Sequence, residues 1–354
     1  MKVKRSSKLT IKFATAKKRA LLKKIITEYS LVVMFFIDFL WDKNLTKTDL
    51  LKNIINLPKT WLSARMCQCA AREALDMVNN AKKAAKAQKR KATKPRHYGK
   101  KMSLTSQIIS IQKGCNSFDL WLVFTSIGNK IKIYIPLKKH RQFNWYQDWK
   151  MAKSIIVHED YIQISFEKEF GNKKTSGIKL GIDVGINHLI ALSDKRLYGS
   201  NVKEYINIIK RKTQNSKAYK RAKKTLSYYN HRIIKEFFRD NNLRLVVVEN
   251  LKGLKSGKHN RGKEFRKTLS NWNYRELLNM IQMRTEENRV SFRSVSPYKT
   301  SQQCPYCSHA ERGNRLGENF YCLKCGYSGH ADIVGAINIL DRFISGRYGA
   351  AFQT

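Results

Sequence analysis

The chain has 354 residues, 42% of them hydrophobic, so it is long enough for two or three domains with apolar cores. Its 70 lysines and arginines outnumber 26 aspartates and glutamates, which gives a formal net charge of +44. Because so large a charge repels itself in a compact chain, we expect a polyanionic partner. The charge is spread along the whole sequence, which favours a long nucleic acid over an anionic membrane surface.

The sequence also argues against several classes of protein. Residues 1–13 contain neither the apolar core nor the cleavage site of a secretion signal. The most hydrophobic run, residues 31–41, is interrupted by Asp38 and is shorter than the roughly 20 apolar residues of a membrane span. No Walker A loop, GxGxxG or GxSxG motif supports nucleoside triphosphate use, nicotinamide binding or serine hydrolysis. We therefore expect a cytoplasmic protein.

The first half begins with a predicted strand at residues 9–13 and two predicted helices, at about 16–40 and 61–87. From residue 103 to 170 the apolar period changes to two, which is typical of strands. The predicted strands are 107–112, 121–125, 130–136, 154–158 and 162–167. We expect a small antiparallel barrel or sheet that the first strand completes, so that the helices are an insertion into a β domain.

Two stretches of the chain are strongly basic. Residues 82–101 carry ten basic residues and no acidic one, and residues 210–239, predicted to be helical, carry eleven and one. The first stretch has two interpretations: a solvated linker, or a segment that contacts phosphates and becomes ordered on binding. The candidate nucleic-acid contacts in the two stretches are Lys82, Lys89, Arg90, Lys91, Arg96, Lys210, Arg211, Lys212, Lys220 and Arg221.

The second half reads as mixed α/β structure. Residues 178–193 predict a strand that ends in a carboxylate, a tight turn and a returning strand. The continuous apolar run 243–249 is typical of a strand buried on both faces. The remaining predicted elements are a linker at 171–176, a helical region at 203–240, a basic loop at 252–267, a helix at 271–288 and a strand at 290–295.

Four of the seven cysteines form two CxxC pairs, Cys304/Cys307 and Cys322/Cys325, with fourteen residues between the pairs. In a reducing compartment such pairs bind metal rather than form disulfides. Four thiolates close a tetrahedral site that is typical of structural Zn²⁺, and an iron–sulfur cluster is the alternative. Cys67, Cys69 and Cys115 stand in apolar contexts and are predicted to be buried thiols.

Three acidic residues stand where burial would be unfavourable. Asp183 and Glu249 each end an apolar strand, and Asp332 begins a helix whose Gly335 and Ala336 allow the close approach of a neighbour. Each alone fits a buried ion pair with a lysine, and Asp332 also fits a helix N-cap. Together they fit a site in which three carboxylates hold two Mg²⁺ or Mn²⁺ ions for phosphodiester hydrolysis.

Five motifs, in order, resemble the RuvC-like nuclease half of TnpB proteins, which are transposon-encoded, RNA-guided DNA nucleases ancestral to compact type V CRISPR effectors. The motifs are GIDVGINHLIAL, LVVVENLKGL, SPYKTSQQCPYC, YCLKCGY and HADIVGAINIL. The resemblance covers about residues 177–345. Over residues 1–176 it is weaker, because it rests on the order of strand, helical insertion and barrel.

The resemblance implies a fold and a set of site residues. The fold would be an RNase H-like (RuvC) α/β nuclease domain with an inserted zinc ribbon, preceded by a β-barrel wedge domain that carries a helical recognition insertion. The implied domains are 1–15 with 103–172 (wedge), 16–102 (insertion), 177–300 with 327–354 (nuclease) and 301–326 (ribbon). By motif, Asp183, Glu249 and Asp332 are catalytic ligands of Mg²⁺ or Mn²⁺. Cys304, Cys307, Cys322 and Cys325 are then the ligands of Zn²⁺.

The implied function is that of an RNA-guided DNA endonuclease, encoded by a transposable element, that cleaves its target by two-metal-ion phosphodiester hydrolysis. Its partners would be a guide noncoding RNA and double-stranded DNA, in a prokaryotic cytoplasm, associated with the nucleoid. The alternatives are a nuclease-inactive RNA-guided repressor, a compact type V CRISPR effector and a transposase that joins strands itself. The presence of all three carboxylates favours an active nuclease over the repressor.

Overall fold

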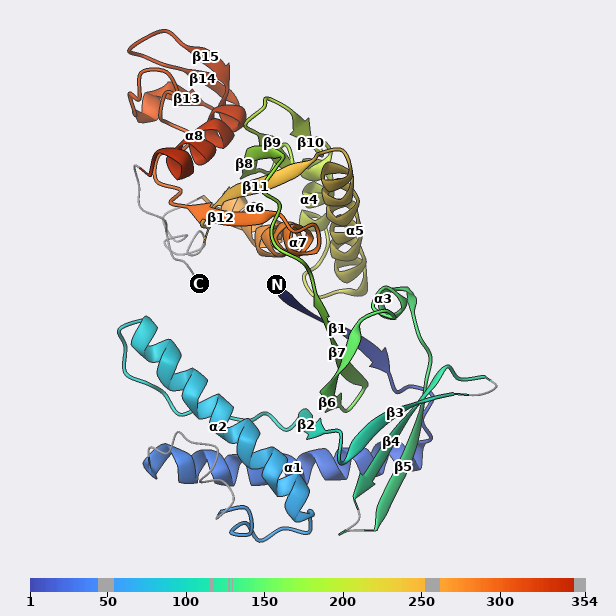
Figure 1. The fold of residues 1–354 in the computed structure, drawn as a ribbon. Coiled ribbons are helices and arrows are strands. Elements are labelled where there is room, and N and C mark those ends of the chain that lie inside the picture. The colour runs from blue at the N-terminus through green and yellow to red at the C-terminus, as the bar shows by residue number, and fades with distance from the viewer. Residues whose placement is uncertain (44–53, 115–116, 127, 129, 252–261, 347–354) are drawn as a thin grey trace. The chain divides into compact units, whose positions relative to one another are not determined.

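The computed structural model describes residues 1–43, 54–114, 117–126, 128, 130–251 and 262–346 (Figure 1). The chain divides into two compact units, an N-terminal unit of residues 2–169 and a C-terminal unit of residues 170–354 with Met1. The division directly precedes the linker predicted at 171–176, and the finer domain boundaries stay a prediction. None of the helices in the described part of the chain has the length and apolarity needed to cross a bilayer.

The N-terminal unit contains two antiparallel sheets. The first has the order β1-β7-β6-β2 and the second the order β3-β4-β5. The strands are β1 (Lys2–Thr10), β2 (Lys101–Thr105), β3 (Ile109–Lys113), β4 (Leu120–Ser126), β5 (Ile131–Leu137), β6 (Lys150–His158) and β7 (Tyr161–Glu169). β1 pairs with β7 along its whole length, so a strand from the start of the chain joins the sheet formed after the helices. Closure of these sheets into a barrel stays a prediction.

The helices α1 (Ala16–Lys43) and α2 (Ala64–Ala87) pack on one another, and α3 (Arg141–Asn144) is a single turn. Apolar residues of α1, α2 and both sheets form one continuous core, in which Leu9, Ile25 and Phe124 are fully buried. Cys67 and Cys69 lie in this core as free thiols, as predicted, whereas Cys115 lies outside the described residues.

Two predictions for this unit were wrong in detail. The strand predicted at residues 9–13 ends at Thr10 and begins at Lys2. β2 was not predicted, because its first residue, Lys101, belongs to the basic stretch. Both strands owe their extent to pairing with distant segments, β7 and β6, and a local alternation pattern does not report such pairing.

The C-terminal unit is built on a mixed sheet of order β10-β9-β8-β11-β12. Its strands are β8 (Ile178–Val184), β9 (Ile190–Leu192), β10 (Leu197–Tyr198), β11 (Leu243–Glu249) and β12 (Ser291–Val295). β11 runs parallel to both of its neighbours, and β9 and β10 are antiparallel additions. β11 therefore lies inside the sheet, as its unbroken apolar sequence predicted.

Helices cover both faces of this sheet (Figure 1). Ile182 and Val248 face one core with α4 (Val202–Lys210), α5 (Lys217–Arg239) and α7 (Tyr274–Glu287). Leu245 and Val247 face the other way, towards α8 (Ala331–Ser345). Since side chains alternate along a strand, Asp183 and Glu249 belong to the face that α8 covers.

Helical periodicity did not predict the bounds of every helix in this unit. The region predicted as one helical stretch, 203–240, is divided into α4 and α5. Part of the predicted basic loop, from Lys263 onward, is α6 (Lys263–Asn271), and residues 252–261 lie outside the described residues. A small antiparallel sheet then follows, formed by β13 (Arg315–Leu316), β14 (Asn319–Tyr321) and β15 (Ser328–His330). It extends past residue 326, where the ribbon was predicted to end.

Candidate active site

Asp183 and Glu249 lie side by side at the carboxyl ends of two neighbouring strands of the C-terminal sheet. β8 and β11 are parallel, and their register pairs Ile182 with Val248. The next residue on each strand is therefore a carboxylate, so the two acids leave neighbouring strands at the same level. The order of the strands, which the sequence does not state, produces this juxtaposition.

The third acid arrives on α8, which lies unusually close to β8. A Cβ on Gly181 would lie 2.1 Å from the carbonyl oxygen of Ala336, and a Cβ on Gly335 would lie 2.9 Å from Asp183 Oδ2. At Gly181 only glycine permits this approach, because the clash is with backbone, whereas a side chain at position 335 would displace the Asp183 carboxylate. Asp332, one turn earlier on α8, then points its Oδ2 to within 3.5 Å of where a Cβ on Gly185 would lie. The close approach expected from Gly335 and Ala336 is thus present.

Charge in this site is only partly neutralised. Burial raises the pKa of Asp183 well above its usual value, and the neighbouring Glu249 and Asp332 raise it further, while Arg315 acts in the opposite direction. Burial likewise raises the pKa of Glu249, against the opposing effects of Thr300, Arg342 and Arg315. A raised pKa means that the folded chain holds the negative charge poorly, so a bound cation would relieve the site.

Among the described residues, Glu249 and Asp332 each have one side-chain hydrogen-bond donor as a direct partner. Arg315 of β13 donates to Asp332 Oδ1 at 2.8 Å, and the Thr300 hydroxyl donates to Glu249 Oε1. The ion pair considered for a lysine is therefore made by an arginine from the small sheet. The N-cap of α8 is His330, whose Nδ1 accepts from the Asp332 N–H, so Asp332 is not the cap.

Two polar residues on α8 hold the segment that carries Thr300. The Asn338 amide donates to the Thr300 and Gln303 carbonyl oxygens, both at 2.7 Å. Arg342, one turn further along, donates to the Ser296 carbonyl at 3.0 Å. Sequence reasoning missed these positions and Arg315. The signal for the two α8 residues was an amide and a guanidinium spaced four apart on a largely apolar helix, whereas Arg315 had no such signal.

Two histidines also border the carboxylates. Potential ligand atoms of His188, Glu318, His330 and Asp332 all lie within 4.8 Å of one another. His188 Nδ1 is 4.0 Å from Glu318 Oε1, and the two imidazole rings are 5.5 Å apart. Sequence reasoning had assigned neither histidine to a site. The signal for His188 was its place five residues after Asp183 in the same motif.

The four cysteines of the CxxC pairs converge, as predicted. Their Sγ atoms lie within 4.8 Å of one another, with Cys304 to Cys325 at 3.6 Å and Cys307 to Cys322 at 3.5 Å. Four thiolates about 2.3 Å from one Zn²⁺ in a tetrahedron would be about 3.8 Å apart, so the sulfurs fit this ion. Burial acts to raise the pKa of Cys322, but backbone N–H groups and neighbouring thiols lower it to about 6.

The predicted nucleic-acid contacts are mostly exposed. Two are half-buried: Lys82, whose Nζ lies 5.4 Å from the centre of the Trp41 ring, and Lys210, which pairs with Glu264 at 3.0 Å. The eight exposed ones are Lys89, Arg90, Lys91, Arg96, Arg211, Lys212, Lys220 and Arg221. Their role in binding stays a prediction.

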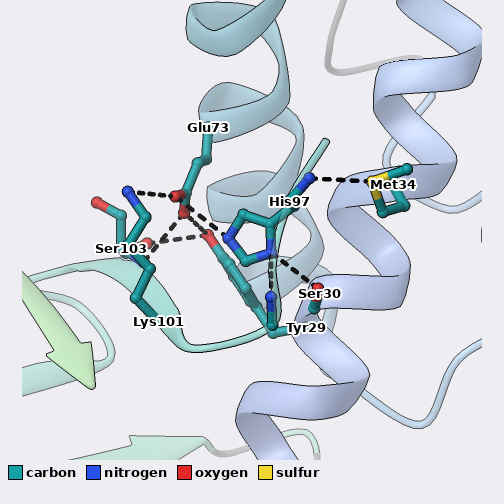
Figure 2. Close-up of polar contacts among 8 residues, drawn as sticks. Tyr29, Ser30, Met34, Glu73, His97, Lys101 and Ser103 are labelled. Atoms are coloured by element: carbon teal, nitrogen blue, oxygen red, sulfur yellow. Dashed lines mark hydrogen bonds and ion pairs between the residues drawn. The ribbon is translucent and has the colours of Figure 1, made fainter. Parts of the chain in front are cut away.

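The N-terminal unit has its own buried carboxylate, Glu73 of α2. Glu73 Oε2 accepts from the Tyr29 hydroxyl at 3.0 Å and from the Ser103 N–H at 3.2 Å (Figure 2). Glu73 Oε1 lies 3.6 Å from His97 Nε2 and 3.4 Å from Lys101 Nζ. Burial alone would raise the pKa of Glu73, but these partners outweigh it and hold the pKa below the usual value. We call these five residues the Glu73 cluster.

Comparisons of sequence place this chain among known proteins. A family model described as "Cas12f1-like, TNB domain" matches residues 274–339, which include α7, β12, the small antiparallel sheet and most of α8. A TnpB-like protein of Methanocaldococcus jannaschii is 24% identical over 264 residues, covering 62% of this chain and 93% of that protein. The chain is similar to TnpB-like proteins. The resemblance predicted from the five motifs is therefore confirmed.

Two further relatives match over a smaller share of their own length. The putative RNA-guided DNA endonuclease InsQ of Escherichia coli is 27% identical over 247 residues, 59% of this chain and 61% of InsQ. The CRISPR-associated endodeoxyribonuclease Cas12f1 of Sulfoacidibacillus thermotolerans is 39% identical over 72 residues, 20% of this chain and 17% of Cas12f1. The chain thus spans less than two thirds of each of these two proteins in the match.

Solved structures show the same fold. The Cas12f1–sgRNA–target DNA complex matches 92% of this chain and 83% of its own with a TM-score of 0.60 at 14% identity. The mini-RNA-guided endonuclease CRISPR-Cas_phi3 matches 95% of this chain and 92% of its own, also with a TM-score of 0.60, at 10% identity. At these identities the likeness concerns the fold alone, and it confirms the mixed α/β architecture.

Proposed function

We propose that this chain is an RNA-guided DNA endonuclease of a transposable element. The observation that carries the proposal is the convergence of Asp183, Glu249 and Asp332 from two parallel strands and α8, with pKa values of the first two raised. Structural ion pairs are arranged to neutralise one another, whereas this site gathers like charges. The RNA-guided endonucleases among its relatives support the choice of reaction and substrate.

The carboxylates fit hard divalent cations. Asp183, Glu249 and Asp332 would hold Mg²⁺ or Mn²⁺, since oxygen ligands select these ions. Such ions, when bound, stabilise the attacking and leaving oxygens of a phosphodiester displacement. Zn²⁺ would be held separately by Cys304, Cys307, Cys322 and Cys325, in a closed site that stabilises structure and leaves no position for substrate.

The other residues of the site would fix the carboxylates in place. The Thr300 hydroxyl orients Glu249, and Arg315 holds one oxygen of Asp332 while the other stays available. Gly335 leaves room for the Asp183 carboxylate against α8. Because Arg315 belongs to the small sheet beside the cysteines, folding of that sheet around its metal would complete the site.

The partners in this proposal are a guide noncoding RNA and a double-stranded DNA target in a prokaryotic cytoplasm, near the nucleoid. The net charge of +44 supports a large polyanion, because phosphates of the guide and of the RNA–DNA duplex would neutralise it. Sequencing the RNA that co-purifies with the protein tests this part. One dominant RNA from the end of its own locus supports a guide, and a random RNA population contradicts it.

The catalytic assignment is tested with Asp183→Asn, which removes a charge and keeps the shape. We expect Mg²⁺-dependent cleavage of a matched plasmid to fall at least about 100-fold, since even residues that only support metal ligands change activity by 10- to 100-fold. Binding of RNA and target should stay within about twofold. Asp341→Asn, an exposed acid on the same helix as Asp332, is the control. Wild-type cleavage by Asp183→Asn would refute the assignment, and no cleavage by the wild type would favour the repressor.

A further inference from the structure

A basic segment without helix or strand, residues 88–100, connects α2 to β2. Its cations Lys89, Arg90, Lys91, Arg96 and Lys100 are exposed, and Lys94 pairs with Asp38 at 2.7 Å. A segment with so much positive charge gains little from burial and is repelled by its neighbours. It therefore needs a specific anchor to keep a defined course.

That anchor is His97, which is 6% exposed. Its Nδ1 lies 2.8 Å from the Ser30 hydroxyl of α1, and its backbone N–H lies 3.2 Å from Met34 Sδ. Its Nε2 faces Glu73 of α2 (Figure 2). One imidazole residue thus ties the basic segment to both helices of the unit.

The two residues after His97 turn the chain outward. Gly99 adopts φ 67°, a conformation that favours glycine, and its N–H reaches back to His97 Nδ1 at 3.4 Å. Tyr98, between His97 and Gly99, is 81% exposed, more than any other large apolar side chain described in the N-terminal unit. A ring so exposed contributes little to the packing of the described part of this unit.

Arg96 and Lys100 flank this ring. Along residues 96–100, the side chains of Arg96, Tyr98 and Lys100 are exposed, whereas His97 is buried and Gly99 is half-buried. Arg96, Tyr98 and Lys100 therefore emerge on the solvent side of the segment. Cations spaced around one exposed aromatic are the elements with which proteins bind single-stranded nucleic acid, because every base has a face on which a ring can stack.

We infer that Tyr98 is a stacking platform for an unpaired nucleobase, with Arg96 and Lys100 contacting the adjacent phosphates and His97 as the positioning residue. The inference rests on the nucleic-acid binding of the proposed function but not on cleavage. Its chemistry fits an unpaired base of either RNA or DNA. A base inside a duplex is stacked on its neighbours and does not offer its face to the ring.

The test uses the full chain and a short single-stranded oligouridylate that carries one 2-aminopurine, whose fluorescence falls on stacking. Tyr98→Ala should weaken binding roughly 5- to 100-fold and abolish the quenching, as expected for loss of one stacked base. Tyr98→Phe should bind within about twofold of the wild type. Undiminished binding and quenching by Tyr98→Ala would overturn the inference.

Salt dependence separates stacking from charge. Tyr98→Ala should leave the slope of log affinity against log salt unchanged, because tyrosine releases no counterion. Arg96→Ala should reduce that slope by about 0.7, the value for one phosphate contact on a single strand. Tyr134→Ala removes another exposed aromatic of the same unit, one with Lys132 5.3 Å from its ring centre. An equal loss of affinity with Tyr134→Ala would refute a specific platform at Tyr98.

The anchor is tested with Ser30→Ala, which removes only the hydroxyl that meets His97 Nδ1, and with His97→Ala. Both should weaken binding and reduce quenching without altering the salt slope, although neither removes aromatic ring nor cation from the platform. Circular dichroism melting identifies a variant that fails to fold, and Ser30→Ala then decides. Unchanged quenching in a folded His97→Ala protein would refute the positioning role.

Parallel measurements with ribose and deoxyribose oligomers identify which nucleic acid the platform binds. A blunt duplex should bind equally well to wild type and Tyr98→Ala.

Discussion

Glu73 in the N-terminal unit and Asp183 in the C-terminal unit are both removed from water, but their pKa values shift in opposite directions. Glu73 accepts two hydrogen bonds and faces a histidine and a lysine, and its pKa is lowered. Asp183 faces two other carboxylates, and its pKa is raised. Burial acts in the same direction on both, so the difference comes from the neighbours that the fold supplies.

This difference separates a structural carboxylate from a candidate ligand. Glu73 finds its neutralising partners within the chain, and the cluster holds the basic segment 88–100 in a defined path. The three carboxylates of the C-terminal unit have few neutralising partners within the chain, because the only side chains among the described residues that donate to them are one arginine and one threonine hydroxyl. Loss of the Glu73 charge should therefore destabilise the N-terminal unit. Loss of one of the three charges in the C-terminal unit should reduce the repulsion there.

The largest effect is expected for Glu73→Ala. It leaves the buried His97 Nε2 and the Ser103 N–H without their shared acceptor, and each buried polar group left unsatisfied costs about 1–3 kcal/mol. Five of the six tryptophans lie in the N-terminal unit, so tryptophan fluorescence during urea denaturation measures its stability. Asp76→Ala, an exposed acid on the same helix, is the control. A loss below about 1 kcal/mol would show that the cluster is not an anchor.

Gly335→Ala should affect activity more than stability. The added methyl would lie 2.9 Å from Asp183 Oδ2, so the carboxylate must rotate away from its position. A displacement of about 1 Å at a reacting centre lowers rates by about 100-fold. Gly262→Ala, whose methyl would meet nothing within 4 Å, is the matched control. Single-turnover cleavage by Gly335→Ala at the wild-type rate would argue against a catalytic position for Asp183.

Asp183→Asn should stabilise the C-terminal unit in the absence of divalent cations. It removes one of three repelling charges, and relief of this kind is worth about 0.5–2 kcal/mol. Hydrogen exchange of β8 and α8, followed by mass spectrometry, measures it. Added Mg²⁺ should stabilise the wild type and have less effect on the variant, because an ion stabilises the state that binds it. Destabilisation without Mg²⁺ would mean that Asp183 is a structural carboxylate like Glu73.

Acid should affect the two units differently, with the smallest effect of the four. The lowered pKa of Glu73 makes its contribution to stability complete above about 4.5 and lost as pH falls below that value. The raised pKa of Asp183 means that stability of the C-terminal unit increases as pH falls from neutral towards 3.8, where the unfolded chain also binds the proton. Hydrogen exchange in each unit between pH 7 and about 4.5, corrected for intrinsic rates, should show protection rising only in the C-terminal unit. Equal responses would remove the distinction.

Local sequence determined a large part of this protein. The CxxC pairs predicted a cluster of four cysteines, because two residues between cysteines place both thiolates on one knuckle. The apolar run 243–249 predicted a buried strand, and the motifs around Asp183, Glu249 and Asp332 predicted a resemblance to TnpB proteins that the comparisons confirm. These signals are carried by neighbouring residues, so they can be recognised without knowing what packs against them.

Tertiary structure alone decided which groups meet. The register of β8 and β11 brings Asp183 beside Glu249, and two glycines allow α8 to bring Asp332 to them. Arg315 and Thr300 reach the site from segments whose sequence gave no electrostatic signal. In the same way, only the fold showed that His97, within the basic stretch 82–101, lies against Glu73. Charge and spacing can be read from the sequence. The neighbours of a buried carboxylate depend on tertiary packing, and those neighbours determine the direction of its pKa shift.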